Sequence, residues 1–457
     1  MRTLILSDLH LGNGGPYDIF AGAAELPALL DASAQPPTHV VLNGDTFDFL
    51  LNDDPLAVDT QRAVEQARAL VTAAPTAPSL KALGRALAAG GRVTMVVGNH
   101  DLELALPDVQ AVVRAALGQP DSVTSRLEFR DGTAPLQLSV GGARVLVTHG
   151  EHTDVTNRID YDALLSSERA SRFHYPPGSV LVKTLLNPLK HRHGLRFMDL
   201  LKPDFQGAVL VGLGVKPEAL RVLFTSGTLT VIRRLLENRG LAPSFALEPM
   251  DAVGPSDADG HLARTLARVD LSDDEVDALL SALDAENLDA FDTPGALGRA
   301  RLKLARAGFA LYAHLHRSVA GSTGSVYFGL EPGKDELAEL ERLGRKYSPQ
   351  AVVMGHTHAA RWHEGPGPVY ANTGTWISLL RLPSPDDSDA DWAEYLAELQ
   401  SNPALEPAKQ QRARLEHRFT CVEVVPRASA PGATLRLAQW TAQGLQTLRA
   451  AELPAGG

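Results

Sequence analysis

The sequence predicts an α/β core that is interrupted by a large, mostly helical insertion, and three observations lead to this fold class. In the first 150 residues, short β-branched runs alternate with longer stretches of helical periodicity, which is typical of layered α/β structure. From residue 159 to residue 346 strand patterns nearly vanish, and after residue 347 they return. We therefore expect a core formed by residues 1–158 and 347–457, with a helical cap insertion at 159–346.

The first part of the core is expected to contain four strands and two helices. Each strand is a short run rich in aliphatic and β-branched residues, and each helix carries apolar residues at helical spacing. The predicted strands are Thr3–Leu6, His39–Leu42, Val93–Val97 and Arg144–Thr148, and the predicted helices are Asp59–Leu70 and Leu80–Ala89.

The insertion is expected to be helical, with a loop rich in Pro, Gly, Asp and Ser at Pro249–Gly260. The segment Ser272-Asp273-Asp274-Glu275 is a capping box, which predicts that an amphipathic helix begins there. The other predicted helices are Ser179–Leu186, Pro217–Phe224, Thr228–Leu236 and Arg299–Leu315.

The second part of the core follows a helix predicted at Lys334–Arg345. An acidic stretch, Pro383–Asp391, is expected to be a solvated loop. The predicted strands of this part are Ala351–Met354, Val369–Ala371, Cys421–Val424 and Thr434–Leu437.

Composition and charge exclude several classes of protein. Hydrophobic residues make up 44% of the chain and charged residues 21%, which argues against an intrinsically disordered protein. The net charge is 43 − 54 = −11, which argues against nucleic acid as a partner. A single cysteine, Cys421, excludes an internal disulfide. No apolar run reaches the ~18–20 residues of a membrane span, and no signal peptide is evident, so we expect a cytoplasmic protein.

Residues that can bind metals gather directly after five of the predicted strands. Functional groups of open α/β sheets collect at the carboxyl ends of strands, where the loops form a crevice. Glycines beside these residues allow tight turns and close backbone approach. The clusters are Asp8-Leu9-His10, Gly44-Asp45, Asn99-His100-Asp101, His149-Gly150 and His356-Thr357-His358, with Asp48 following Asp45.

The types of donor in these clusters select the metal chemistry. Carboxylate, imidazole and amide groups without a thiolate favour divalent Mn, Fe, Zn, Ni or Co over a structural zinc site. Seven donors exceed the needs of one tetrahedral ion and suit two ions that share a carboxylate. Two ions about 3.5–4 Å apart can clamp a phosphate and generate a hydroxide nucleophile near neutral pH.

Five short motifs, taken in order, resemble the signature blocks of the calcineurin-like metallophosphoesterase superfamily. They are Ser-Asp-Leu-His, Asn-Gly-Asp-Thr-Phe-Asp, Gly-Asn-His-Asp, Thr-His-Gly and Gly-His-Thr-His, and no ligand is missing. The resemblance covers Met1–Arg158 and Tyr347–Leu380, not the insertion. It implies a two-sheet β-sandwich flanked by helices and a metal-dependent phosphoesterase with two divalent ions, manganese being the first expectation.

The resemblance also implies a role for each residue of the motifs. The implied ligands are Asp8, His10 and His358 for the first metal, Asn99, His149 and His356 for the second, and Asp45 as the bridge between them. The catalytic pair would be His100, which protonates the leaving oxygen or stabilises the transition state, and Asp48, which orients it. Asp101 is expected either to anchor the site by hydrogen bonds or to cap the following helix.

A narrower resemblance concerns the segment from His149 to Arg158. It is similar to bacterial relatives of UDP-2,3-diacylglucosamine diphosphatase, whose helical cap receives a nucleotide-linked or lipid-linked diphosphate. This chain departs from that enzyme in two ways, because it has a histidine, His100, where the enzyme has an arginine, and because its insertion is much longer. The substrate implied is a small-molecule or lipid-linked phosphate.

The segment Lys183–Lys202 mixes basic and apolar residues in an otherwise acidic chain. One interpretation is a surface that binds phosphate or contacts anionic membranes peripherally. The alternative is a pair of ordinary amphipathic helices whose basic side chains are solvated. The candidate substrate-binding residues are Arg158, Lys190, Arg192 and Arg196.

Two other functions compete with a cap-selected phosphoesterase. A nuclease or cyclic-nucleotide phosphodiesterase could use the same core, although a nuclease would be expected to have an extended basic groove. A non-catalytic scaffold is the alternative of another class, but such scaffolds usually lack a ligand or the catalytic histidine, and this chain retains them all.

Overall fold

The computed structural model describes most of the core and part of the insertion. The described residues are 1–15, 18–51, 59–154, 157–166, 175–201, 211–212, 214–215, 269, 271–272, 274–275, 277–278, 295–316, 331–383, 387–409 and 415–456. The helices predicted at Pro217–Phe224 and Thr228–Leu236, and the loop at Pro249–Gly260, lie outside them.

The chain forms two compact units. The first consists of Met1–Lys183, Phe328–Leu379 and Glu416–Gly457, and the second of Thr184–Tyr327 and Leu380–Leu415. Both predicted boundaries of the insertion therefore fall inside the first unit. Two short paired strands, β10 (Leu379–Leu380) and β11 (Leu415–Glu416), lie where the chain passes between the units.

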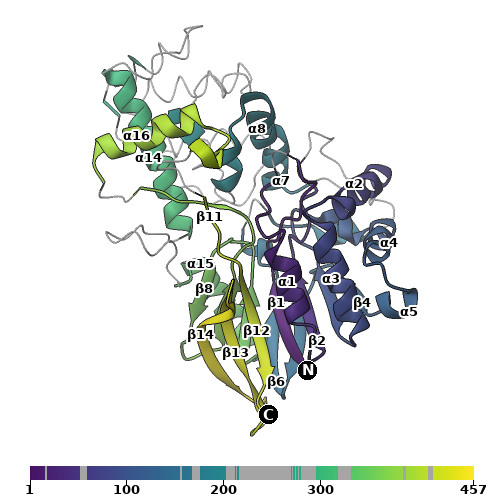
Figure 1. Ribbon diagram of the computed structural model, residues 1–457. Helices are drawn as coiled ribbons and strands as arrows, with labels where there is room; N and C mark the ends of the chain where they lie inside the picture. Colours follow the sequence, from purple (N-terminus) through teal and green to yellow (C-terminus); the bar gives the residue numbers. More distant parts are fainter. Residues whose placement is uncertain are drawn as a thin grey trace. The chain divides into compact units, whose positions relative to one another are not determined.

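Seven strands form the larger sheet of the first unit, in the order β14-β13-β12-β1-β2-β3-β4. Strands β1 to β4 run parallel, and β12 to β14 form an antiparallel meander that joins the sheet at β1. The bounds are β1 Arg2–Leu6, β2 Thr38–Asn43, β3 Arg92–Val96, β4 Leu127–Arg130, β12 Thr420–Pro426, β13 Gly432–Thr441 and β14 Gly444–Pro454. Figure 1 shows helices α1 and α3 beside β1 and β2.

Five strands form the second sheet, in the order β5-β6-β7-β9-β8. The three central strands are parallel and the two edge strands antiparallel to their neighbours. The bounds are β5 Leu136–Val140, β6 Ala143–Val147, β7 Ala351–Met354, β8 Ala360–His363 and β9 Val369–Thr373. Two main sheets flanked by helices confirm the predicted fold class.

The hydrophobic core of the first unit lies between the two sheets. Alternate residues point inward from both, for example Ile5 and Val422 from the larger sheet and Val145 and Val353 from the smaller one, all 0% exposed. The intervening residues of the smaller sheet, such as Val352, pack on the other side against α15. This alternation is the period-two pattern of strands with both faces covered.

Helices cover the outer faces of the sheets. The helices of the first unit are α1 Glu25–Ala32, α2 Thr60–Thr72, α3 Ala77–Ala88, α4 Pro107–Ala116, α5 Asp121–Thr124, α6 Tyr161–Leu165, α7 Pro177–Leu181 and α15 Lys334–Tyr347. Among the helices of the second unit are α8 Asn187–His193, α14 Ala296–His316 and α16 Asp389–Ser401.

No helix in the described part of the chain combines the length and apolarity needed to cross a membrane.

Several elements were not predicted or begin elsewhere than predicted. Strands β4, β5 and β14 lie at sheet edges, and their many exposed or half-buried residues weaken the strand pattern. The acidic stretch Pro383–Asp391 is not entirely a loop, because α16 begins at Asp389. Its cap is Ser388, whose side chain accepts a hydrogen bond from the Asp391 N–H, and acidic residues in a first turn favour a helix start.

A buried carboxylate of helix α15 contacts another part of the first unit. Glu339 accepts hydrogen bonds from Arg342 at 2.6 Å and contacts His152 Nε2 at 2.8 Å. His152 follows metal-ligand candidate His149 by three residues, in the short helix η2 (Glu151–Thr153). Burial raises the pKa of Glu339, but the hydrogen bonds from Arg342 and His152 outweigh it and lower the pKa to about 2.

Replacing Glu339 by glutamine should therefore destabilise the protein in a pH-dependent way. Since the pKa is lowered from 4.5 to about 2 on folding, the ionised carboxylate stabilises the fold above about pH 4.5, and this stabilisation is lost as the pH falls toward 2. We expect Glu339→Gln to lower the free energy of unfolding by about 1–2 kcal/mol at neutral pH, and by less at about pH 3.5. Urea unfolding measures both values.

Glu341→Gln is the matched control on the same helix. Glu341 pairs with Arg345 at 3.2 Å, and both side chains are more than 70% exposed, at 72% and 73%. Exposed pairs contribute little, so this change should have almost no effect. Equal losses for the two variants would contradict the assigned role of Glu339.

Candidate metal centre

Five of the seven predicted metal ligands have a left-handed backbone. Their φ angles are 52° at Asp8, 48° at His10, 50° at Asp45, 70° at His356 and 57° at His358. These residues lie just beyond the carboxyl ends of β1, β2 and β7, where the chain leaves its sheet. Each such conformation costs on the order of 1–3 kcal/mol, so surrounding contacts must hold it in place.

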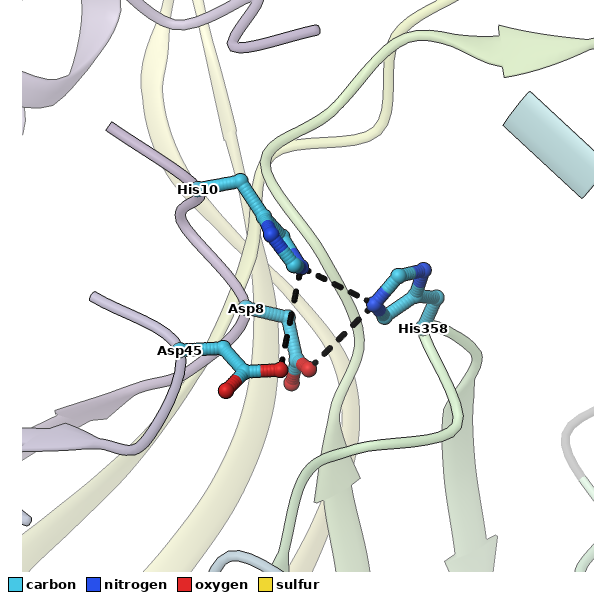
Figure 2. A group of neighbouring side chains, drawn as sticks. All are labelled: Asp8, His10, Asp45 and His358. Atoms are coloured by element: carbon cyan, nitrogen blue, oxygen red, sulfur yellow. Dashed lines mark hydrogen bonds and ion pairs between the residues drawn. The ribbon is translucent and has the colours of Figure 1, made fainter. Parts of the chain in front are cut away.

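The first cluster joins residues that are far apart in the chain (Figure 2). Asp8, His10, Asp45 and His358 are buried, and each offers a ligand atom within 4.8 Å of the others. His10 Nε2 lies 3.1 Å from His358 Nε2 and 3.9 Å from Asp45 Oδ2. His358 Nε2 lies 3.4 Å from Asp8 Oδ1. Two carboxylates and two imidazoles are a donor set that suits first-row divalent metals.

The second cluster forms around His149. Asp45, His149 and His356 again place ligand atoms within 4.8 Å of one another. His149 Nε2 lies 3.4 Å from Asp45 Oδ2 and 3.4 Å from Asn99 Oδ1. His149 Nδ1 lies 2.9 Å from the carbonyl oxygen of Asn43, and donating to it leaves Nε2 to bind a metal. The same oxygen of Asp45 thus faces both clusters.

Divalent cations fit this donor set because, among the described residues, its carboxylates pair only with histidines and not with a lysine or arginine. Asp8 is 0% and Asp45 1% exposed, and in the described part of the chain neither pairs with a lysine or arginine. None of the described residues donates a hydrogen bond to Asp8 Oδ1. Buried charge without compensation costs several kcal/mol, and bound cations would remove that cost while accepting the imidazole lone pairs.

The pKa values of the two carboxylates, Asp8 and Asp45, are shifted in opposite directions. Burial raises the pKa of Asp8. Burial also acts to raise the pKa of Asp45, but the charges of His149 and His100 outweigh it and hold that pKa well below its usual range. Asp45 is in turn one of the groups that raise the pKa of His149, against the effect of burial. A metal that binds His149 must displace its proton, so metal binding is linked to proton release.

Two glycines allow the ligand loops to approach one another. An ideal Cβ on Gly98 would lie 2.2 Å from Asp45 Oδ1, and one on Gly44 would lie 2.3 Å from the His149 ring. Gly44 also has a φ angle of 83°. Any side chain at either position would push a predicted ligand out of place.

Asp101 ties these loops together. Its Oδ1 accepts a hydrogen bond from Gly98 N at 2.6 Å, and its Oδ2 accepts from Thr46 N at 2.7 Å and Phe47 N at 3.3 Å. Burial and the charge of Asp45 raise its pKa to about 7, despite these hydrogen bonds. Its side chain makes no cap hydrogen bond to the following short helix, so its contacts are those of an anchor.

The predicted catalytic pair is in contact. His100 Nδ1 lies 3.1 Å from Asp48 Oδ1, and both side chains are buried. The other oxygen of Asp48, Oδ2, lies 3.6 Å from Nδ1 of His10. One carboxylate therefore contacts both the predicted proton donor and a predicted ligand of the first metal. The contact through Nδ1 leaves His100 Nε2 as the atom that could deliver a proton.

The four candidate substrate-binding residues are not brought together by any described contact. Arg158 is exposed, and its Nε donates to the carbonyl oxygen of His152 at 3.3 Å. Lys190 is 0% exposed and lies in the second unit, where its ammonium is 2.7 Å from Asp199. Arg192 is exposed and Arg196 half-buried in the same unit. Lys190 is therefore a buried ion-pair partner of Asp199 and not an exposed basic residue.

Three residues that the motifs do not predict lie beside the second cluster. Asp154 Oδ2 lies 3.4 Å from His356 Nε2, and Asn157 Oδ1 accepts from Asn99 Nδ2 at 3.4 Å. Ser179 Oγ donates to the carbonyl oxygen of Asn99 at 3.0 Å. The only available signal was the polar spacing of Asp154 and Asn157 after the fourth motif, and no local pattern marks Ser179.

Residues 1–194 match the profile of the calcineurin-like phosphoesterase family. The match includes four of the five motifs and confirms the superfamily that they predict. The chain therefore carries a calcineurin-like phosphoesterase domain and is a metal-dependent phosphoesterase. A search of curated proteins finds no significant match to this chain.

We expect the purified protein to bind two divalent ions per chain after metal loading. Asp45 Oδ2 faces both clusters, so Asp45→Asn should reduce occupancy of both sites. His10 belongs to the first cluster, so His10→Ala should mainly empty that site. Elemental analysis after equilibrium dialysis measures the stoichiometry.

His363→Ala serves as the control, because His363 is a half-buried histidine on β8 outside both clusters. It should bind as much metal as the wild type. At most one ion per wild-type chain would rule out a two-ion centre.

Proposed function

We propose that this metal-dependent phosphoesterase hydrolyses a phosphate ester or pyrophosphate bond at a centre of two divalent ions, with manganese as the first candidate. The proposed ligands are Asp8, His10, Asp45 and His358 for one ion and Asp45, Asn99, His149 and His356 for the other. The observation that supports it most is the position of Asp45 Oδ2, 3.9 Å from His10 Nε2 and 3.4 Å from His149 Nε2. One oxygen between two imidazole clusters is the arrangement of a bridging ligand.

The bound ions would polarise the phosphate and activate water for attack near neutral pH. The protein would supply the proton for the leaving oxygen. His100 is the candidate, because Asp48 holds its Nδ1 and would stabilise its protonated form. The imidazole also lies edge-on to His10, with ring centroids 4.6 Å apart, so it is adjacent to the first cluster.

We further propose that the helical insertion selects the substrate, which would be a nucleotide-linked or lipid-linked phosphate. Connectivity supports this, since the chain enters the insertion soon after His149 and returns shortly before His356. A cap at this point would exclude bulky macromolecules and add contacts to a smaller phosphate without changing the metal chemistry. Arg192 and Arg196 are its candidate contacts to phosphate or to an anionic membrane, in a cytoplasmic protein.

His100→Ala should lower turnover by about 10²–10⁴-fold, the usual range for loss of a general acid. Metal content should stay near that of the wild type, because His100 is not a proposed ligand. Asp48→Asn should lower turnover less, because it removes the orienting partner and not the proton donor. Steady-state kinetics with a phosphate ester, together with elemental analysis, measure both effects.

A comparison of leaving groups provides the internal control. The loss caused by His100→Ala should shrink for para-nitrophenyl esters, whose leaving group needs little protonation, and be larger for alkyl esters. Equal losses for both classes of ester would show that His100 stabilises charge and is not the acid.

The role of the basic residues in the second unit can be tested with Arg192→Glu/Arg196→Glu. Lys190 is left unchanged, because its replacement would leave Asp199 buried without its partner. If the arginines contact a natural phosphate substrate or anionic lipid, the double variant should impair turnover of that substrate far more than of a small chromogenic ester. Binding to anionic liposomes should fall too, and should weaken with added salt.

Arg449→Glu is the control, because Arg449 is exposed on β14 of the first unit and its described hydrogen bond is local, from Nη1 to the carbonyl oxygen of Leu448. It should change neither activity nor liposome binding. If the double variant also leaves both unchanged, the segment is a solvated helix surface.

A further inference from the structure

Two side chains that follow the fourth motif connect ligands of the proposed second metal. Asp154 and Asn157 are joined to each other, with Asn157 Nδ2 donating to Asp154 Oδ2 at 2.7 Å. One end of this pair contacts Asn99 and the other contacts His356. Asn99 and His356 are 257 positions apart in the chain, because 356 − 99 = 257. The pair therefore links two ligands that come from different sheets.

Asn157 contacts the amide group of Asn99. The amide nitrogen of Asn99, Nδ2, donates to Asn157 Oδ1 at 3.4 Å. This orientation leaves the amide oxygen of Asn99 on the other side, where it lies 3.4 Å from His149 Nε2. Only the oxygen of an amide binds a divalent metal, so a reversed amide would present a donor N–H to the cation. Asn157 thus holds Asn99 in the orientation that can bind metal.

Asp154 has the corresponding relation to His356. Its Oδ2 lies 3.4 Å from His356 Nε2, but Asp154 is not part of the group of ligand atoms formed by Asp45, His149 and His356. The carboxylate therefore lies outside the cluster, next to one nitrogen of a ligand imidazole. An imidazole that donates Nε2–H to a carboxylate has its lone pair on Nδ1, and such partners orient metal-binding histidines and raise their basicity.

Helix α7 packs against Asn157 and Asn99. Gly178 packs so closely on Asn157 that an ideal Cβ would lie 2.2 Å from Asn157 Oδ1. The next residue, Ser179, is 0% exposed, and its Oγ donates to the carbonyl oxygen of Asn99. Both the side chain of Asn157 and the backbone of Asn99 are thereby fixed by neighbouring residues of one helix.

We propose that Asp154 and Asn157 are positioning residues for the second metal: Asn157 orients the amide of Asn99, and Asp154 orients the imidazole of His356. The proposal rests on the two-ion centre proposed above. Because their described hydrogen bonds reach Asn99 and His356, both proposed ligands of the second metal, the main effect of losing them should fall on the second site. Loss of such hydrogen-bonding partners typically lowers metal affinity about 10–100-fold.

The test is a titration of metal-free protein with Mn²⁺, followed by calorimetry and by elemental analysis at fixed free metal. In Asp154→Ala and Asn157→Ala, the affinity of one of two ions should fall about 10–100-fold while the other is unchanged. Gly178→Ala should act in the same direction through displacement of Asn157. Turnover should recover when free Mn²⁺ is raised, which loss of folded protein would not allow.

Two controls separate positioning from a general effect on folding. Asp131→Asn removes a half-buried carboxylate whose described hydrogen bonds stay within its own turn, to Thr133. Gly367→Ala adds a Cβ with nothing within 4 Å. Both should bind two ions as the wild type does. If Asp154→Ala and Asn157→Ala also bind two ions with wild-type affinity, the positioning roles are wrong and the two-ion centre stands. If the wild type binds only one ion, both proposals are wrong.

Discussion

The buried carboxylate of Asp45 is the group on which the rest of the site depends. Its Oδ2 faces His10 and His149, and its Oδ1 accepts the backbone N–H of His100 at 2.9 Å. A carboxylate that is 1% exposed requires opposite charge near it, and its ion-pair partners in the described part of the chain are two histidines, His10 and His149. This requirement accounts for the donor set of both clusters, and the space that Asp45 occupies accounts for the glycine at position 98.

The site also depends on backbone that would be unfavourable in isolation. Left-handed conformations at five proposed ligands turn the chain sharply at the strand ends, and their cost is borne by the packed sandwich and by hydrogen bonds between the loops. Asp101 joins the loops after β2 and β3, and the N–H of Gly355 donates to the carbonyl oxygen of His149 at 2.9 Å. Since these loops come from both sheets, the hydrophobic core between the sheets sets the geometry of the clusters.

Segments near both ends of the insertion belong to the unit that holds the metal centre. Helix α7 contacts Asn99 through Ser179, and helix α15 contacts the loop after His149 through Glu339. These elements can set metal geometry directly. In the described part of the second unit, the basic segment Lys183–Lys202 contains a fully buried ion pair between Lys190 and Asp199.

The sequence by itself determined the α/β class, the strands at the centre of each sheet and the residues that form both clusters. It could do so because central strands are continuous apolar runs, and because metal ligands directly follow them as short local motifs. Edge strand β14, the start of α16, and the partners Asp154, Asn157 and Ser179 were decided only by the tertiary structure. Edge strands lack a distinctive pattern, and whether a polar side chain is buried beside a ligand depends on neighbours distant in the chain. The burial of Lys190 was likewise not predictable from the sequence. Its charge suggested a surface contact, but the structure pairs it with Asp199, nine residues further along the chain.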